Sequence, residues 1–178
     1  MNILVLADTH IARASVLLPG AVLAALPQAD LILHAGDITT SAVLRELERH
    51  APVHAVAGNN DDAALCRSLP ERIIVEVAGY RIGVVHGHGD RGSTYGRAQA
   101  AFAGDRVACV VFGHSHQPLT ETVANILYLN PGSPTQRRRQ AQWSFAWLRC
   151  GQALTAELVF FDRPPRVYPS IDSSRHSH

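Results

Sequence analysis

The chain has 178 residues, of which 47% are hydrophobic and 17% are charged, and this composition is typical of a globular protein rather than a disordered or fibrous one. Its length suits one domain with a buried core. The formal net charge of only +1 gives no general attraction to nucleic acid or to an anionic membrane surface.

The first part of the chain alternates between predicted strands and helices. Short runs rich in Val, Ile and Leu predict strands at residues 2–7, 30–34 and 53–57. Apolar residues at helical spacing predict helices between them, at residues 15–26 and 41–50. The second helix opens with three candidate N-cap residues, Thr39, Thr40 and Ser41. This alternation predicts βα units.

The rest of the chain is predicted to be richer in hairpins. Gly79 and Tyr80 read as the turn of a hairpin between strands 73–78 and 81–86, and a helix at 94–102 precedes a strand at 107–112. Four further strands, at 119–123, 126–129, 144–148 and 154–161, predict an antiparallel arrangement. Two sheets packed face to face with helices outside would accommodate both parts. We therefore expect one domain at 1–162, followed by a flexible tail rich in Pro, Ser, Arg and His at 163–178.

The cysteines and the apolar segments predict a cytoplasmic protein. Cys66, Cys109 and Cys150 are odd in number and far apart, which argues against a disulfide framework or a thiolate metal site and fits a reducing compartment. The N-terminus lacks the basic region of a secretory signal. The longest apolar stretch, 16–27, contains Pro19 and Gly20 and is shorter than the roughly 20 residues that span a bilayer.

Seven polar side chains follow apolar runs of the predicted sheets. In open α/β sheets, ligand sites lie at the carboxyl ends of strands, so we expect these side chains along one edge. Residues two apart on an extended backbone point the same way, so His88 can also pair with a member of this set. Four glycines adjoin the set and allow sharp turns there, Gly36, Gly58, Gly87 and Gly113. The seven residues are Asp8, His10, Asp37, Asn59, His86, His114 and His116.

Seven oxygen and imidazole donors exceed what one ion normally takes from a protein, but they suit two ions that share a carboxylate. We choose Asp37 as that bridge. The mixed nitrogen and oxygen set favours Mn, with Fe, Ni or Zn as alternatives. Two divalent ions beside two aspartates leave a net charge of about +2, which suits hydroxide and a phosphate anion. Such ions, roughly 3.5 to 4 Å apart, can activate a bridging water and hold both oxygens of an in-line displacement.

The order of these motifs resembles the calcineurin-like metallophosphoesterases, and most of all the small YfcE-type phosphodiesterases, whose compact chains lack a lid domain. The resemblance extends from Asn2 to about Ser133, and five motifs in the family's order make it specific. The motifs are Asp-Thr-His at 8–10, Gly-Asp at 36–37, Gly-Asn-Asn-Asp at 58–61, His-Gly-His-Gly at 86–89 and Gly-His-Ser-His at 113–116. Asn-Pro-Gly-Ser at 130–133 is shared with the small members.

The resemblance implies a fold and a ligand set. The fold is α/β, a four-layer αββα sandwich of two mixed β-sheets flanked by helices. One metal is implied at Asp8, His10, Asp37 and His116. The other is implied at Asp37, Asn59, His86 and His114. Asn59 would contribute a neutral amide oxygen and leave more positive charge for the phosphate.

Asn60 departs from the pattern of many larger relatives, which have a His after the Gly-Asn motif. That imidazole is thought to protonate the leaving oxygen, which an amide does not do, so we expect weaker catalysis on poor leaving groups. Small YfcE-type members also tend to lack this His. Asp61 and His88 are the candidates to compensate. For His88, support of neighbouring ligands and mere proximity to the site are about equally good explanations.

Other polar and aromatic residues receive mainly structural interpretations. His34 and His54 lie in or beside strands, and His50 is expected to end a helix, where a cation is mildly favoured. The run Arg137 to Arg139 is read as a solvated loop, with contact to an anionic substrate as the alternative. Core packing is preferred for three aromatic residues, and an interface in a homo-oligomer is the alternative for them: Trp143, Phe145 and Trp147.

The preferred functional hypothesis is an enzyme that hydrolyses a phosphodiester by in-line attack of a metal-bridging hydroxide, with catalytic contributions from Asp37, Asn59, Asn60 and His88. A small phosphodiester or another phosphate ester is the expected substrate, since nothing in the sequence signals a nucleic-acid surface or a membrane. The alternative is a non-catalytic scaffold for protein binding, as in the related retromer subunit. A third hypothesis is metal binding without turnover, which Asn60 keeps open.

Overall fold

The computed structural model describes residues 1–12 and 18–162 of the chain. Within them, the first three strands and the last two form a five-stranded sheet in the order β10-β9-β1-β2-β3. The three N-terminal strands run parallel, whereas β9 is antiparallel to β1 and β10 to β9. The bounds are β1 (Asn2–Leu6), β2 (Leu31–His34), β3 (Val53–Ala55), β9 (Trp143–Cys150) and β10 (Leu154–Phe161).

The five middle strands form a second sheet in the order β4-β5-β6-β8-β7. Its three inner strands, β5, β6 and β8, are parallel, and the two outer strands pair antiparallel with their neighbours through short turns. Both sheets are therefore mixed, as expected. The bounds are β4 (Arg72–Val77), β5 (Tyr80–Val85), β6 (Cys109–Phe112), β7 (Leu119–Val123) and β8 (Ile126–Asn130).

The main core lies between the two sheets. Ile3 and Val5 of β1 face Ile82 and Val84 of β5 within one buried cluster. Alternate residues of β1, such as Leu4, point to the opposite face and join a second cluster beneath helices. Because side chains alternate along a strand, burial on both faces requires the continuous apolar run seen in the sequence.

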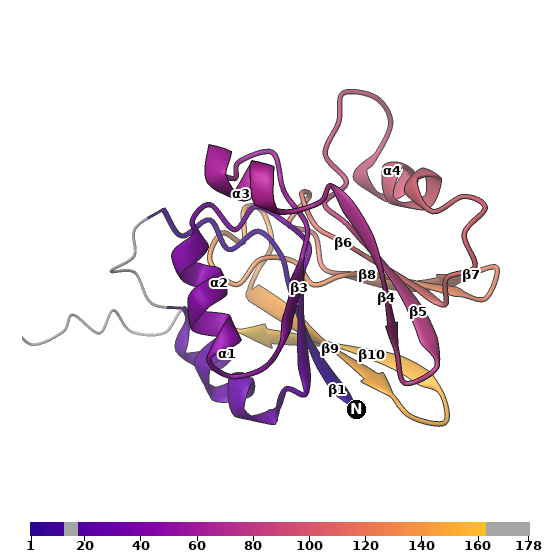
Figure 1. Ribbon diagram of the computed structural model, residues 1–178, viewed down its shortest axis with the longest axis horizontal. Coiled ribbons are helices and arrows are strands. Elements are labelled where there is room, and N and C mark those ends of the chain that lie inside the picture. The colour runs from indigo at the N-terminus through magenta and orange to yellow at the C-terminus, as the bar shows by residue number, and fades with distance from the viewer. Residues whose placement is uncertain (13–17, 163–178) are drawn as a thin grey trace, which may run out of the picture.

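Helices cover the outer faces of both sheets and complete the αββα layers (Figure 1). Buried residues of α1, α2 and α3 pack on the first sheet, and Phe145 and Trp147 of β9 belong to the same cluster, which confirms core packing for these two aromatics. Ala98 of α4 packs on the second sheet with Phe112. The bounds are α1 (Gly20–Ala25), followed by the 3₁₀ turn η1 (Leu26–Gln28), α2 (Ser41–Glu48), α3 (Ala63–Ser68) and α4 (Thr94–Ala101).

Several local predictions were wrong. The first helix begins at Gly20 and gives way to η1 at Leu26, while residues 15–17 of its predicted range lie outside the described residues. The hairpin turn consists of Ala78 and Gly79, both at positive φ (48° and 81°), so Tyr80 already belongs to β5. Two successive residues at positive φ give the twist that joins antiparallel strands. The predicted tail at 163–178 also lies outside the described residues.

The short helix α3 was missed altogether. Asp62 caps it, since its carboxylate accepts hydrogen bonds from the backbone N–H groups of Ala64 and Leu65 at 2.9 Å each. Thr40, by contrast, occupies the N-cap position of α2 without capping it, because its hydroxyl donates to the carbonyl of Ile11 at 3.1 Å.

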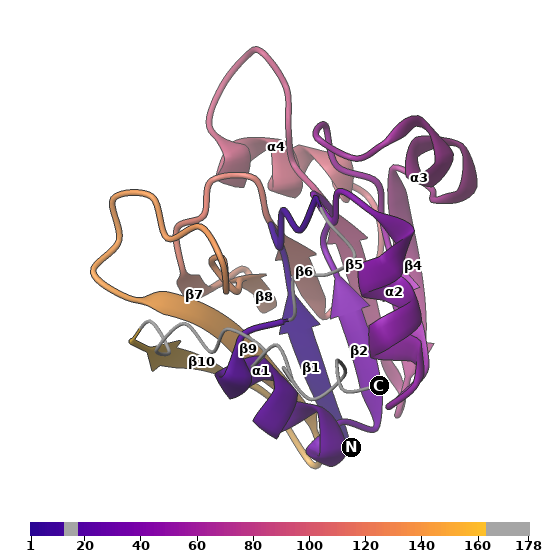
Figure 2. The ribbon, with the colours of Figure 1, turned by 90° about the vertical axis from the view of Figure 1, so that its left-hand side faces the viewer.

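The parallel strands of both sheets bring their carboxyl ends to one edge of the molecule. β1 and β2 run side by side in the same direction, and the loops that follow them lie beyond the arrowheads (Figure 2). In the part of the chain that is described, no helix has the length and apolar character needed to cross a membrane.

Candidate metal centre

Loops after β1, β2, β3, β5 and β6 converge at this edge and carry the predicted site residues. Six donor side chains fall into two groups, and within each group the donor atoms lie within 4.8 Å of one another. The first group is Asp8, His10 and His116, and the second is Asp37, His86 and His114. His10 and His116, which are 106 positions apart in the chain, are thus direct neighbours, as the strand-end pattern predicted.

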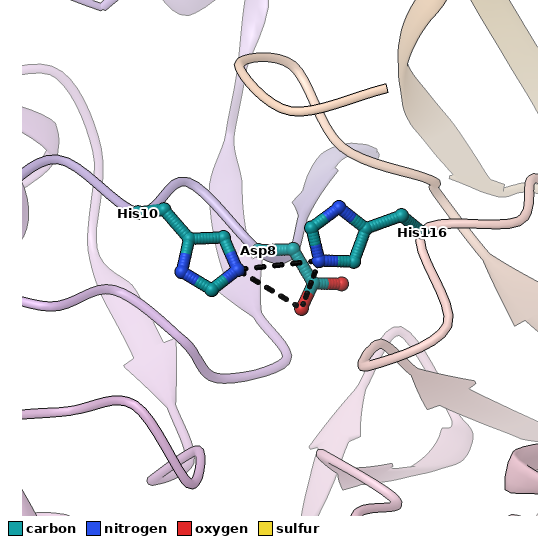
Figure 3. A group of neighbouring side chains, drawn as sticks. All are labelled: Asp8, His10 and His116. Atoms are coloured by element: carbon teal, nitrogen blue, oxygen red, sulfur yellow. Dashed lines mark hydrogen bonds and ion pairs between the residues drawn. The ribbon is translucent and has the colours of Figure 1, made fainter. Parts of the chain in front are cut away.

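The three side chains of the first group point toward one another (Figure 3). The Nε2 atoms of His10 and His116 are 3.2 Å apart, and their rings stack with centroids at 5.1 Å. Oδ1 of Asp8 lies 3.4 Å from Nε2 of His116 and 3.8 Å from Nε2 of His10. The side chains of Asp8 and His116 are completely buried, and 11% of the His10 side chain is exposed.

The second group gathers around the amide of Asn59. Its Oδ1 lies 3.2 Å from Nε2 of His86 and 3.1 Å from Nδ1 of His114. Oδ2 of Asp37 lies 3.3 Å from Nε2 of His86. The two imidazole rings meet edge to face, with centroids 5.2 Å apart.

Asp37 contacts both groups. Its Oδ2 atom is 3.5 Å from Nε2 of His10 in the first group, besides its contact with His86 in the second. Asn60 holds this carboxylate through two hydrogen bonds, from its backbone N–H to Oδ1 at 2.8 Å and from its side-chain Nδ2 to Oδ2 at 2.7 Å. The position and orientation of Asp37 therefore suit a ligand shared by two ions.

Backbone carbonyls fix the orientation of the two fully buried imidazoles. Nδ1 of His86 lies 2.7 Å from the carbonyl of Ala35, and Nδ1 of His116 lies 2.5 Å from the carbonyl of Gln136. A carbonyl accepts only, so each Nδ1 carries the proton and donates it. The Nε2 atom of each ring is then free to bind a metal, as is usual for histidine ligands in proteins. These carbonyl partners have no signature in the sequence.

The two carboxylates of the site have opposite electrostatic environments. Burial raises the pKa of Asp8 to about 7, and neither of its oxygens has a hydrogen bond of normal geometry among the described residues. Burial acts in the same direction on Asp37, but the hydrogen bond and charge of His86, with the two hydrogen bonds from Asn60, outweigh it and hold the pKa well below its usual value. Two orphaned, buried carboxylate oxygens at Asp8 are the environment that a cation would satisfy.

The histidines respond to the same surroundings. Burial lowers the pKa of His114 and of His116 to about 4, so both imidazoles are neutral at neutral pH, the form in which histidine binds a metal. Burial also acts to lower the pKa of His86, but its hydrogen bond to Asp37 and the charges of Asp8 and Asp37 raise it overall. Two acceptors, Asp37 and Asn59, thus converge on the Nε2 atom of His86.

The backbone of the site adopts a conformation that side chains rarely take. Five of the seven candidate ligands have positive φ angles, a region that costs a non-glycine residue about 1 to 3 kcal/mol. Such strain persists only where the surrounding structure enforces it and is concentrated at functional sites. The residues are Asp8 (54°), His10 (45°), Asp37 (55°), His114 (64°) and His116 (58°).

Gly58 is required for space rather than for an unusual φ. A Cβ atom there would lie 2.2 Å from the backbone nitrogen of Asp37 and 2.3 Å from its Oδ1. The absence of a side chain therefore lets the loop after β3 approach Asp37. Gly36, by comparison, combines a φ of 89° with a close approach to the ring of His86.

The Asn-Pro-Gly-Ser segment at 130–133 is hydrogen-bonded to two loops of the site. The Ser133 hydroxyl donates to the carbonyl of Asp8 at 2.7 Å, and Nδ2 of Asn130 donates to the carbonyl of Gly113 at 2.9 Å. Asp8 follows a strand of the first sheet and Gly113 follows a strand of the second. The segment thus ties the two halves of the site together across the sandwich.

Of the other residues considered in the sequence, one lies at the exposed edge of the site and two make structural contacts. His88 is exposed at the rim, with its ring centroid 5.5 Å from that of His86. The Asp61 carboxylate accepts hydrogen bonds from the backbone N–H groups of Thr39 and Gly58, at 2.6 and 2.7 Å, so it holds two loops and does not face a substrate as a free acid. His34 is buried and bonded to the Thr9 hydroxyl at 3.1 Å, which agrees with its structural interpretation.

Arg138 belongs to the site, although the sequence favoured a solvated loop for it. Its guanidinium donates to the carbonyl of His114 at 3.3 Å, and its positive charge contributes to the lowered pKa values of His114 and His116. The neighbouring Arg137 instead lies over the ring of Trp143 at 5.0 Å. The arginine run was the only sequence signal for this contact.

Comparison with known proteins agrees with this geometry. Residues 1–153 match the calcineurin-like phosphoesterase superfamily domain. The chain belongs to this superfamily. A probable metallophosphoesterase of Methanothermobacter thermautotrophicus is 36% identical over 89% of this chain and 92% of its own length. A phosphodiesterase of Methanocaldococcus jannaschii is 26% identical over 58% of this chain and 66% of that protein.

Among solved structures, that of Vps29 from Entamoeba histolytica in complex with zinc is similar to the structure of this chain, with a TM-score of 0.67. The match covers 91% of this chain and 100% of that one at 24% identity, so it shows a shared fold. Family membership identifies the chain as a phosphoesterase-type hydrolase that binds divalent metal, and the donor set of the site, with its orphaned Asp8 oxygens, fits such an ion.

Proposed function

We propose that this protein is a phosphodiesterase whose site holds two divalent cations, with Mn favoured and Fe, Ni or Zn as alternatives. One observation carries the proposal: two groups of donor atoms meet at a single carboxylate, Asp37, which contacts a histidine of each group. A purely structural polar cluster would pair its acceptors with donors, whereas here the Asp8 oxygens have none of normal geometry within the described chain.

The ligand assignment follows the two groups. Asp8, His10 and His116 would hold one ion together with Asp37. Asn59, His86 and His114 would hold the other, again with Asp37. The assignment is supported by the spacing of the donor atoms, all within 4.8 Å inside each group, and by the contacts of the Asn59 oxygen with His86 and His114.

Two bound divalent cations would supply the charge that activates water and stabilises a phosphoryl group during hydrolysis. The protein's own side chains prepare the site for a phosphate anion. Asn59 contributes a neutral oxygen rather than a third carboxylate, so the cations keep a net positive charge. Arg138 adds a positive charge next to His114.

Asn60 is proposed to position Asp37 rather than to transfer a proton. Both its backbone and its side-chain amide are engaged by that carboxylate, and an amide is not a general acid. His88 is the titratable group that the rim offers for proton transfer to a leaving group, since it is exposed and lies next to His86 and His114. Because the residue at position 60 supplies no proton, esters with good leaving groups, which need none, should be the better substrates.

The expected substrate is a small phosphodiester. The name of the Methanocaldococcus relative supports a diester, and the formal charge of +1 gives no broad basic surface for a long nucleic acid. Cys66, Cys109 and Cys150 are free thiols, in keeping with a cytoplasmic location. A homo-oligomer is compatible with the proposal and is not required by it.

The test is a comparison of metal content and turnover in purified protein without a His tag. Wild type should cleave bis-p-nitrophenyl phosphate when Mn is added, and faster than it cleaves p-nitrophenyl phosphate. Asp37→Ala should lose this activity and its bound metal, whereas Glu48→Ala, which removes an exposed carboxylate of α2, should retain both. Full activity in Asp37→Ala would refute the bridge.

The second candidate function is a non-catalytic protein-interaction module on the same fold. The structural likeness to Vps29 is the observation that favours it. This candidate predicts a protein that binds metal and a protein partner but turns over no phosphate ester with any of the four metals. It also predicts that Asp37→Ala, if folded, keeps partner binding.

A further inference from the structure

A cavity of about 350 Å³ adjoins the loop that carries His114 and His116. It is formed by the start of α4 and by the loop that runs from β6 to β7. Ser115, one of its lining residues, stands between His114 and His116 in the chain. Cavities of roughly 300 to 1,000 Å³ are the usual size of small-ligand sites in proteins.

The helical wall of this cavity is fixed to the site. Arg97 of α4 donates through Nε to the carbonyl of Gly87 at 2.8 Å, and Gly87 directly follows His86. Thr94, which lines the cavity, also packs beside Gly87, because a Cβ atom on Gly87 would lie 3.2 Å from its Cγ2. The cavity and the two donor groups therefore share the same loops and keep a defined relative position.

The chemistry of the cavity is neutral. Tyr95, Phe112 and Leu119 provide apolar surface, and the rings of Tyr95 and Phe112 lie with centroids 6.0 Å apart. Thr94, Ser115 and Gln117 provide hydroxyl and amide groups. Every residue that lines the cavity in the described part of the chain is uncharged. A second phosphate would be poorly served here, whereas an uncharged ring with a few polar atoms would fit.

Tyr95 also brings a hydroxyl group to the residues that line the cavity. Burial and a contact with the Glu121 carboxylate raise the pKa of Tyr95, so the hydroxyl stays protonated at neutral pH. This hydroxyl has no hydrogen bond of normal geometry within residues 1–12 and 18–162.

We propose that this cavity, which we call the ester pocket, binds one of the two ester groups of the substrate, an uncharged group of ring size such as an aryl alcohol or a nucleoside. The inference rests on the proposed function, because the phosphate of the same molecule must lie at the metal centre. It also gives a physical reason for diester preference when the pocket holds the ester group that stays on phosphorus: the single ester group of a monoester is the one that leaves, so no retained group fills the pocket.

The test compares two diester anions of equal charge. Diphenyl phosphate and dimethyl phosphate are titrated separately into Mn-loaded protein and followed by calorimetry. Wild type should bind the diphenyl anion more tightly by roughly tenfold or more, the gain expected from burying one aromatic ring. Equal affinities would overturn the ester pocket.

Gln117→Trp places a large side chain at the pocket from an exposed position. It should abolish the preference for diphenyl phosphate and leave dimethyl phosphate binding unchanged. Gln117→Phe tests the same point with a smaller ring. The matched control is Thr122→Trp, at an exposed position of β7 that does not line the pocket. A folded Gln117→Trp protein that keeps the full preference would overturn the proposal.

Turnover of bis-p-nitrophenyl phosphate separates this inference from the function on which it rests. Hydrolysis without any preference between the two anions would contradict the pocket and leave the phosphodiesterase proposal intact. Selective binding of diphenyl phosphate that Gln117→Trp removes, without turnover of any ester, would support the pocket and contradict catalysis.

Discussion

The two halves of the candidate metal centre are held in different ways, although both are built from strand-end loops. In one half, Asp8 is buried with no hydrogen bond of normal geometry to its carboxylate in the described residues. In the other, Asp37 is equally buried but accepts two hydrogen bonds from Asn60 and lies 3.3 Å from His86. Burial raises the pKa of Asp8 to about 7, whereas the contacts of Asp37 overcome burial and lower its pKa.

The two carboxylates therefore differ in how much their environment depends on a bound metal ion. In the half that contains Asp37, protein groups already hold the carboxylate. In the half that contains Asp8, the carboxylate has no hydrogen bond of normal geometry among the described residues, so we expect a cation to contribute most to stability there. Loops at the ends of the same strands thus carry both carboxylates: Asp37, which protein groups hold in place as the proposed bridging ligand, and Asp8, whose environment favours metal uptake.

The sharpest test of this contrast is the stability of metal-free protein with Asn in place of each aspartate. At pH 8, Asp8→Asn should raise the free energy of unfolding by roughly 1 to 3 kcal/mol, because it removes an unpaired buried charge. Asp37→Asn should lower it by roughly 1.5 to 3 kcal/mol, because charge-assisted hydrogen bonds are lost. Thermal and urea unfolding in EDTA measure both changes.

The pH dependence of the Asp8→Asn effect provides its control. The pKa of Asp8 is about 7 in the folded protein and near the ordinary aspartate value of 3.8 in the unfolded chain. The folded state therefore binds more protons between these values, and stability is lost as the pH rises through this window. At pH 5, which lies inside this window, the substitution should have a smaller effect than at pH 8, and an equal effect at the two pH values would contradict the unpaired charge.

Asn60→Ala tests whether the Asp37 half is preorganised. Loss of the side-chain hydrogen bond to Oδ2 should weaken metal binding by about 10- to 100-fold, the usual cost of removing a group that orients a ligand. Competition with a fluorescent chelator measures the affinity. Gln152→Ala removes an exposed amide and should have no effect. Wild-type affinity in Asn60→Ala would show that the backbone N–H of residue 60 alone orients Asp37.

Metal affinity should also depend on pH, through Asp8 in one half of the site and His86 in the other. Burial raises the pKa of Asp8 to about 7, and the carboxylates raise that of His86 above its usual value, so both hold protons at pH 6. An incoming cation must displace them, and affinity should rise by about tenfold per pH unit for each proton displaced. Calorimetry in two buffers of different ionisation enthalpy counts these protons at pH 6 and 8.5. In Asp8→Asn the count at pH 6 should fall by about one.

Much of the site could be predicted because its signal is local. Each candidate ligand follows an apolar run that became a strand, and parallel strands bring their carboxyl ends to one edge. The same reasoning failed where tertiary contacts decide the outcome. The boundary of α1, the absence of capping by Thr40 and the carbonyl partners of His86 and His116 depend on neighbours that are distant in sequence.

Two features with a sequence signal were nevertheless missed. Asp62 before Ala-Ala-Leu is a usable N-cap signal for α3, but six residues are too few to show helical periodicity. The arginine run was interpreted by its composition, which favours a solvated loop. Only the fold separates its members, placing Arg137 over Trp143 and Arg138 at the carbonyl of His114.

The smallest expected effect is that of Arg138→Gln, which removes a positive charge that acts on histidines of both groups, His114 and His116. The Arg138 side chain is exposed, so solvent and salt screen it, and we expect KM for an anionic diester to rise only about threefold while kcat changes little. Arg139→Gln, also in the exposed run, is the matched control and should leave KM unchanged. Because the interaction is electrostatic, the ratio of KM values between variant and wild type should shrink as salt increases from 0.05 to about 0.5 M. A salt-independent ratio would show that Arg138 acts by shaping the loop at His114 rather than through its charge.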